Sequence, residues 1–95
     1  MLEKEIQNEI VDYLKQNRIF FFQNYADGLP DIIICYKGRF IGLELKKPKT
    51  GRAQGHQKII SKEIRKSGGI SAFPTSLTEV KRILKKIDAE EHLCR

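Results

Sequence analysis

The sequence contains no tryptophan, one methionine and only two cysteines among its 95 residues. Cys35 and Cys94 do not have the spacing of a zinc knuckle or of a disulfide framework, so we expect a reducing, cytoplasmic environment. No apolar run approaches the ~20 residues that span a membrane, and the N-terminus lacks the basic and then apolar order of a signal peptide. These absences predict an intracellular protein that is neither secreted nor bound to a membrane.

The net charge of +6 is unevenly distributed along the chain. Residues 1–45 contain five Lys and Arg against seven Asp and Glu, whereas residues 46–95 contain thirteen against five. Basic surfaces attract polyanions, of which nucleic acid is the commonest, although a lysine-rich face is often only solvated. The charge therefore favours DNA as a partner without establishing it, and the change of sign begins at Lys46.

Hydrophobic periodicity predicts a small mixed α/β protein. Apolar residues at three-to-four spacing indicate helices at residues 2–16 and 54–67 and after Ser76-Leu77-Thr78-Glu79, which has the form of a capping box. We expect the chain to fray beyond about residue 88, where it becomes a polar tail. Short β-prone segments predict strands at 19–24, 32–36, 40–46 and 70–73. The fold class is therefore α/β (α+β mixed sheet), with the order αβββαβα in one domain.

The segment from Asp31 to Lys46 reads as an antiparallel hairpin, with Lys37-Gly38-Arg39 as its turn. Counting from a three-residue turn pairs Tyr36 with Phe40, so that Asp31 faces Leu45 and Ile32 faces Glu44. This register leaves the two carboxylates within one residue of each other. Strand alternation then places Ile41, Leu43 and Leu45 on the core face, and Gly42, Glu44 and Lys46 on the other.

Two neighbouring carboxylates repel each other unless a cation lies between them. The oxygens of Asp31 and Glu44, with the backbone carbonyl of Leu45, are ligands that Mg²⁺ accepts. Such an ion polarises a phosphodiester and lowers the pKa of bound water, while Lys46 positions that water or stabilises the developing charge. A Glu-x-Lys triplet alone is commonly a solvated pair. Here the preceding Gly28-Leu29-Pro30-Asp31 and the following basic loop favour a metal site.

Pro30-Asp31 and Glu44-Leu45-Lys46 match the signature of the PD-(D/E)XK nuclease superfamily. Within it, the chain resembles the stand-alone VRR-NUC domains over nearly its whole length. The resemblance implies a restriction-endonuclease-like core across residues 1–95, and a homodimeric endonuclease that uses Mg²⁺ or Mn²⁺ and no small-molecule cofactor. Further matching segments are Glu3-Lys4-Glu5-Ile6-Gln7, Asn24, Lys47-Pro48-Lys49, Gly51-Arg52, Gln57 and Gly68-Gly69-Ile70.

The resemblance also assigns roles to single residues. It implies that Gln57 reaches the active site, although periodicity alone allows a polar residue at the end of an apolar stripe. It makes Glu3 the helix carboxylate that completes the metal site, with Glu5, Glu9 and Gln7 as competitors. His56 and His92 are expected to have no chemical role. The predicted catalytic residues are Asp31, Glu44, Lys46, Gln57 and Glu3, the metal ligands are Asp31, Glu44, Leu45 and Glu3, and the phosphate contacts are Lys47, Lys49, Arg52, Lys58 and Lys62.

The leading hypothesis is an endonuclease that is selective for branched DNA such as Holliday junctions. The alternatives are a flap or duplex nuclease of the repair or restriction type with the same fold, and a catalytically silent nucleic-acid-binding module. Phe20-Phe21-Phe22 supports the implied homodimer, because a two-faced strand buries only some of these rings in its own core.

Overall fold

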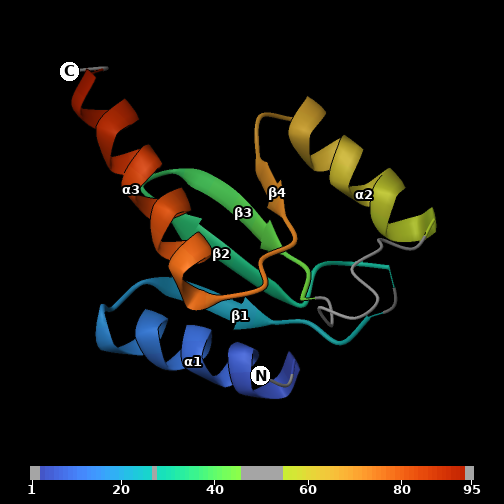
Figure 1. The fold of residues 1–95 in the computed structure, drawn as a ribbon. Helices are drawn as coiled ribbons and strands as arrows, with labels where there is room; N and C mark the ends of the chain where they lie inside the picture. Colours follow the sequence, from blue (N-terminus) through green and yellow to red (C-terminus); the bar gives the residue numbers. More distant parts are fainter. Residues whose placement is uncertain (1–2, 27, 46–54, 94–95) are drawn as a thin grey trace.

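The computed structural model describes residues 3–26, 28–45 and 55–93, and its elements follow the predicted order αβββαβα (Figure 1). The mixed sheet flanked by helices is therefore confirmed. Within the described residues, no helix is both long enough and apolar enough to cross a membrane. The helices are α1 (Glu3–Gln16), α2 (Gly55–Lys66) and α3 (Leu77–Leu93), and the strands are β1 (Phe20–Gln23), β2 (Ile32–Tyr36), β3 (Arg39–Leu43) and β4 (Ile70–Ala72).

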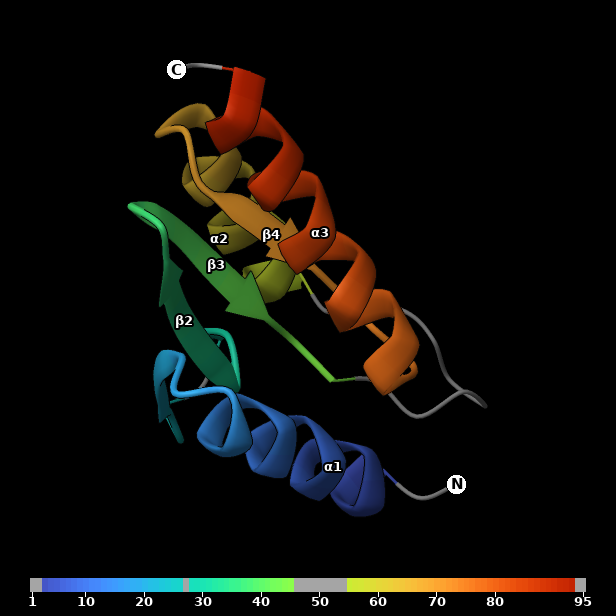
Figure 2. The same ribbon diagram turned by 90° about the vertical axis from the view of Figure 1, so that its left-hand side faces the viewer.

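The four strands lie in the order β1-β2-β3-β4. The first three form antiparallel pairs, whereas β4 pairs with β3 in parallel. A parallel neighbour requires a crossover connection, and α2 lies within that connection. Figure 2 shows α3 in front of β4 and α2 behind it, so the two helices lie on opposite sides of this part of the sheet.

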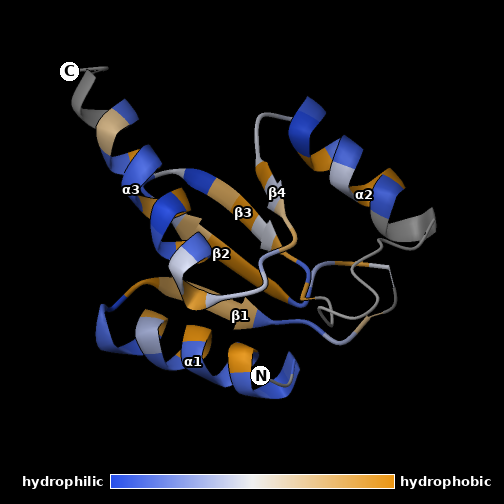
Figure 3. Cartoon of the chain, in the orientation of Figure 1, coloured by the Kyte–Doolittle hydropathy of each residue, from blue (hydrophilic) through white to orange (hydrophobic). Residues whose placement is uncertain are grey.

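We call the side of the sheet that faces α1 and α3 the packed face. Every second strand residue points to it, as the alternation predicted, and Ile41, Leu43 and Leu45 are all buried there. The apolar stripe of α1 turns towards this face (Figure 3). The buried core of the described residues consists of Ile6, Ile10, Val11, Leu14, Ile32, Ile34, Ile41, Leu43, Leu45, Val80, Leu84 and Ile87.

We call the opposite side of the sheet the open face, and α2 packs against only part of it. A Cβ on Gly42 would lie 2.8 Å from Cγ of Pro30 and 3.2 Å from Cδ1 of Ile64, so only glycine lets these groups approach β3 so closely. The helix predicted at residues 54–67 is confirmed as α2, and Ile60 and Ile64 of its apolar stripe are half-buried. Among its described side chains Ser61 is buried as well, which the stripe did not predict. The hydroxyl of Ser71 in β4 donates a hydrogen bond to Oγ of Ser61 at 2.7 Å.

The turn between β2 and β3 contains two residues rather than the predicted three. Lys37 and Gly38 have φ values of 49° and 80°, which suits the tight type I′ turn of two-residue hairpins. The strands therefore pair Tyr36 with Arg39 and Ile32 with Leu43. The predicted register, with Tyr36–Phe40, Ile32–Glu44 and Asp31–Leu45, is wrong by one residue. One further step along the observed register brings Asp31 opposite Glu44.

Helix α3 extends beyond the predicted point of fraying and continues to Leu93. Its extension faces the tip of the hairpin. Nζ of Lys37 lies 2.6 Å from Oδ1 of Asp88, and the hydroxyl of Tyr36 donates to the same oxygen at 2.8 Å. Arg39 forms a second ion pair, with Glu90. The prediction that the chain frays after Asp88 is therefore wrong, because contacts with a distant turn continue along the helix.

Candidate active site

Asn24 fixes the loop that leads into Asp31. Its backbone N–H donates to the carbonyl oxygen of Asp31 at 2.8 Å, and its Nδ2 donates to the carbonyl oxygen of Pro30 at 3.2 Å. Its Oδ1 accepts a bond from the N–H of Ala26 at 3.3 Å. Gly28 adopts φ 81°, a left-handed conformation that suits glycine. Both ends of this loop are thus held together at the point where β2 begins.

The carboxylate of Asp31 reaches across to the chain that follows β3. Its Oδ2 accepts a hydrogen bond from the backbone N–H of Leu45 at 2.9 Å. On the other side, the N–H of Glu44 donates to the carbonyl oxygen of Ala72 at 3.0 Å. The segment that carries Glu44 is therefore held between the start of β2 and the end of β4.

Asp31 and Glu44 belong to the same face of the sheet. Asp31 lies two residues before Ile33, and Glu44 lies two residues after Gly42, while Ile33 and Gly42 form a pair on the open face. Glu44 is only 8% exposed, and burial of a carboxylate requires hydrogen bonds or a compensating positive charge. The structure thus brings together the two acids on which the predicted chemistry depends.

The donor set at this end of the sheet fits a hard cation. Within the described residues, no three Asp, Glu, His or Cys side chains gather as a metal-binding group. Mg²⁺ commonly uses only one or two carboxylates and completes its octahedron with water and phosphate oxygens. The pair Asp31 and Glu44 meets that requirement, and the buried Leu45 contributes its backbone carbonyl to the same short segment. Because Oδ2 of Asp31 accepts the N–H of Leu45, Oδ1 is the oxygen through which this carboxylate could bind a cation.

Glu3 lies apart from this pair, in the first turn of α1. It lines a hollow that also contains Gln7, Gln23 and Tyr25, and it does not join Asp31 and Glu44 in a three-membered group. Its assignment to the metal site therefore stays a prediction, as do the competing assignments to Gln7, Glu5 and Glu9.

The structure describes only some of the predicted catalytic and phosphate-contacting residues between positions 46 and 62. Gln57 falls in the first turn of α2, but its side chain lies outside the described residues, as does that of His56. Lys58 and Lys62 are exposed on α2, one turn apart. The remaining predicted residues, Lys46, Lys47, Lys49 and Arg52, lie outside the described residues.

The sequence did not indicate how Asn24, Ser61 and Ser71 act. Asn24 matched the family pattern, but nothing in its neighbourhood predicted hydrogen bonds to both Pro30 and Asp31. No sequence pattern predicted a contact between the two serines, which forms only because the crossover folds α2 onto β4.

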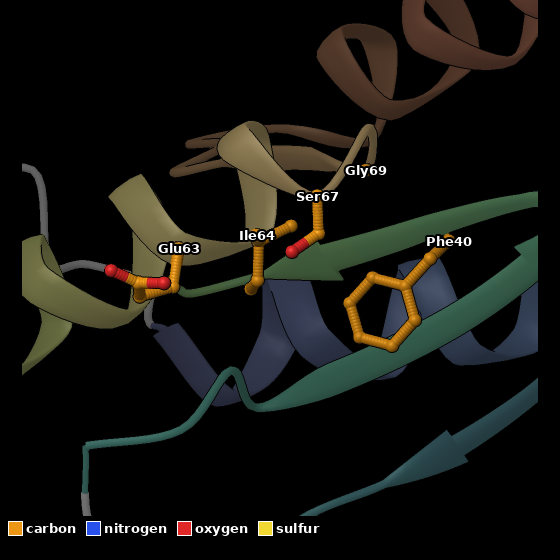
Figure 4. A pocket seen from close by; sticks show the side chains of 5 residues that line it. All are labelled: Phe40, Glu63, Ile64, Ser67 and Gly69. Atoms are coloured by element: carbon orange, nitrogen blue, oxygen red, sulfur yellow. The ribbon is translucent and has the colours of Figure 1, made fainter.

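The open face also carries an apolar area away from the acids. Phe20, Cys35 and Phe40 form one row across β1, β2 and β3. The two phenylalanines are 67% and 43% exposed, and Phe22 beside them is 49% exposed. Next to Phe40 is a hollow of about 390 Å³, which Figure 4 shows between the aromatic ring and α2. Its lining consists of Phe40, Glu63, Ile64, Ser67 and Gly69.

Comparison with solved structures shows that the chain has the fold of VRR-NUC domains. A structure described as "VRR_NUC domain" superposes with a TM-score of 0.73 at 18% identity, over 87% of this chain and 94% of its own. A second, described as "VRR_NUC domain protein", gives a TM-score of 0.73 at 19% identity, over 90% and 86%. No family model and no curated protein matches the sequence. At this identity the similarity establishes the fold, and it confirms at that level the resemblance based on sequence motifs.

Proposed function

We propose that the chain is a metal-dependent DNA endonuclease that hydrolyses phosphodiester bonds, with branched DNA such as Holliday junctions as its substrate class. The hydrogen bond from the N–H of Leu45 to Oδ2 of Asp31 carries this proposal. It joins one acid to the segment that contains the other, in a fold shared with VRR-NUC domains. The nearly buried Glu44 at this position supplies the second carboxylate that a metal-assisted reaction requires.

Each residue of the site has a separate task in the proposed reaction. The free oxygen of Asp31, the carboxylate of Glu44 and the carbonyl of Leu45 would hold Mg²⁺ or Mn²⁺. When bound, the ion supplies positive charge that polarises the phosphodiester and makes a water more acidic. The Leu45 hydrogen bond fixes the Asp31 carboxylate before substrate arrives, which reduces reorganisation during the reaction. Lys46 would stabilise charge on the phosphate oxygens, and Glu3 and Gln57 would orient water around this centre.

The phosphate contacts are proposed to continue along α2. Lys58 and Lys62 are exposed on this helix one turn apart, and Lys47, Lys49 and Arg52 would extend the basic surface towards the acids. Contacts of this kind position a duplex without reading its bases. Each phosphate that is neutralised lowers the logarithm of the binding constant by about 0.9 per tenfold rise in salt, so binding should be strongly salt-dependent.

We infer that a second copy of the chain covers the apolar area of the open face. The row of Phe20, Cys35 and Phe40 contains no charged side chain, in a chain whose net charge is +6. Copies of one basic chain repel each other, so an uncharged surface suits their contact. The same area presents both projecting rings and the hollow beside Phe40, and a two-fold dimer requires such self-complementarity. A homodimer would also supply two active sites for two strands of a junction.

The test of the proposed activity is a cleavage assay with the full chain on a four-way junction, a flap and a linear duplex. The reactions contain Mg²⁺, Mn²⁺ or EDTA. We expect metal-dependent, symmetric cleavage of the junction, and a loss of about 10³-fold or more in Asp31→Asn and Glu44→Gln, because each removes a charged metal ligand. Asp12→Asn is the matched control, since Asp12 is exposed on α1 away from the site.

The alternatives predict different outcomes of the same assay. Preferential cleavage of the flap or the duplex would support the alternative of a repair- or restriction-type nuclease with the same fold. Binding without cleavage in every metal would support the silent nucleic-acid-binding module. If Glu44→Gln cleaves DNA as fast as the unaltered chain, Glu44 has no role in the reaction and the proposal is contradicted.

A further inference from the structure

Tyr25 is the most exposed of the large apolar side chains that the structure describes, at 84%. It directly follows Asn24, whose N–H donates to the carbonyl oxygen of Asp31 at 2.8 Å. The Asn24 side chain also accepts a hydrogen bond from the N–H of Ala26, on the far side of Tyr25. The exposed ring of Tyr25 therefore extends from the backbone segment that holds the catalytic acid Asp31 in place.

The ring borders a hollow of about 500 Å³ between the start of α1 and the end of β1. Three carboxamide side chains, a single carboxylate and a single ammonium group complete the lining. One lysine beside one glutamate does not form a phosphate site, and the carboxamides do not suit an apolar segment. The lining consists of Glu3, Lys4, Gln7, Asn8, Gln23 and Tyr25.

An aromatic face next to carboxamides matches the chemistry of a nucleobase. Every base has a π-face that stacks on an aromatic side chain, and the donor and acceptor of Gln or Asn pair with base edges. A base inside a duplex does not expose its face, whereas an unpaired base does so at little cost. The hollow therefore fits one unpaired base better than a duplex.

We propose that this hollow accepts an unpaired nucleobase of the DNA, which stacks on Tyr25 while Gln7 and Gln23 face its edge. The proposal rests on the proposed function, because it takes DNA as the substrate of Asp31 and Glu44. It gives selectivity for branched DNA a physical basis: a base at a branch point lacks a continuous stack and leaves its pair more easily than a base inside a duplex, and it is then held beside the backbone of the acid. The selection is by strand opening and not by sequence.

The experiment measures binding to two DNA probes that each contain one 2-aminopurine. In the first probe, a junction, the 2-aminopurine is placed at an unpaired position. In the second, a continuous duplex, it is paired. All measurements are made in EDTA, so that no strand is cut. With the unaltered chain we expect quenching of 2-aminopurine fluorescence by the stacked ring. In Tyr25→Ala the quenching disappears and the affinity for the junction falls about 5- to 150-fold, the range for loss of one base stack. The affinity for the duplex stays within twofold.

Tyr25→Phe is the matched control, because it keeps the ring and removes only the hydroxyl. It should quench and bind like the unaltered chain, and thermal melts check that all variants fold. Unchanged quenching in Tyr25→Ala, or an equal loss of affinity for junction and duplex, would overturn the base site. If the unaltered chain quenches 2-aminopurine and binds the junction but cuts no DNA in Mg²⁺ or Mn²⁺, the base site is supported and the proposed nuclease function is contradicted. If the chain cuts DNA but Tyr25→Ala changes neither the quenching nor the affinity for the junction, the nuclease function is supported and the base site is contradicted.

Discussion

The two faces of the sheet are built from adjacent residues and differ in almost every physical property. Ile34 is fully buried on the packed face, whereas its neighbour Cys35 is exposed on the open face. The packed face is covered by α1 and α3 and contains only apolar side chains in its core. The open face carries the two acids, exposed rings and a helix that covers it only in part. The comparison shows that the packed face supplies the hydrophobic core, whereas the open face carries the two candidate acids.

The largest difference between the faces should appear in paired substitutions of neighbours in β2. Ile34→Ala leaves a cavity in the core and should lower the free energy of unfolding by about 2–5 kcal/mol. Cys35→Ala should change it by less than about 0.5 kcal/mol, because the side chain is exposed. Urea unfolding of both variants at one low protein concentration gives the two values. Similar losses in the two variants would contradict the division between the faces.

The inferred dimer predicts a second asymmetry, in association and not in folding. Phe22→Lys introduces a charge beside the aromatic row and should raise the dimer dissociation constant about 100-fold or more, equivalent to about 2.7 kcal/mol. Thr78→Lys adds the same charge on α3, next to the packed face, and should leave association unchanged. Sedimentation equilibrium over a concentration series measures both constants. A monomeric unaltered chain would exclude the dimer without affecting the packed-face result.

A third prediction concerns the close contact at Gly42. Gly42→Ala places a Cβ 2.8 Å from Cγ of Pro30, and overpacking of this kind costs about 1–3 kcal/mol. Pro30 precedes Asp31, so cleavage should fall together with stability. In a Pro30→Ala background, Gly42→Ala should lower the free energy of unfolding by a smaller amount, because the Pro30 ring that crowds the new Cβ is absent. Thermal unfolding of the four chains measures this coupling, and strictly additive costs would count against the contact.

The smallest effect is expected at the hairpin tip. The hydrogen bond from Lys37, and then that from Tyr36, lowers the pKa of Asp88 below its ordinary value. A carboxyl with a lowered folded pKa stabilises the fold above its unfolded pKa, near 3.9, and this contribution is lost as the pH falls through the folded value. Asp88→Asn should therefore be less stable at pH 7, with the difference from the unaltered chain shrinking below about pH 4.

Urea midpoints at pH 7 and at about pH 2.5 measure this change. Asp12→Asn removes the same charge from the exposed side of α1 and is the matched control. A deficit of Asp88→Asn that is equal at both pH values would mean that the carboxylate charge does not hold α3 to the hairpin.

The sequence predicted the elements of this fold because their signals are local. The period of α1 and the alternation along β3 lie within single elements, and Ser76 and Glu79 begin α3 as a capping box predicts, with the N–H of Glu79 donating to Oγ of Ser76 at 3.4 Å. The carboxylate of Glu79 accepts from the N–H of Thr75 rather than from that of Ser76. The presence of Asp31 and Glu44 at one end of the sheet also followed from the hairpin pattern.

The errors concern features that depend on distant partners. The extent of α3 depends on Asp88 and its contacts with the hairpin tip, 51 and 52 positions away in sequence. The burial of Ser61 depends on Ser71 across the crossover. The register depended on a left-handed Lys37, which is uncommon for a residue other than glycine and has no clear sequence signal.

The two-residue turn at Lys37 and Gly38 has a consequence for how this scaffold tolerates insertions. Side chains alternate with a period of two, so one added residue in the turn that slips the pairing by one exchanges the faces of a whole strand. Such a slip would turn Glu44 towards the hydrophobic core and expose Leu43 and Leu45. Two added residues would restore the faces but displace Glu44 along the strand from Asp31. The length of a solvent-exposed turn, remote from any reacting atom, is thus under the same constraint as the acids themselves.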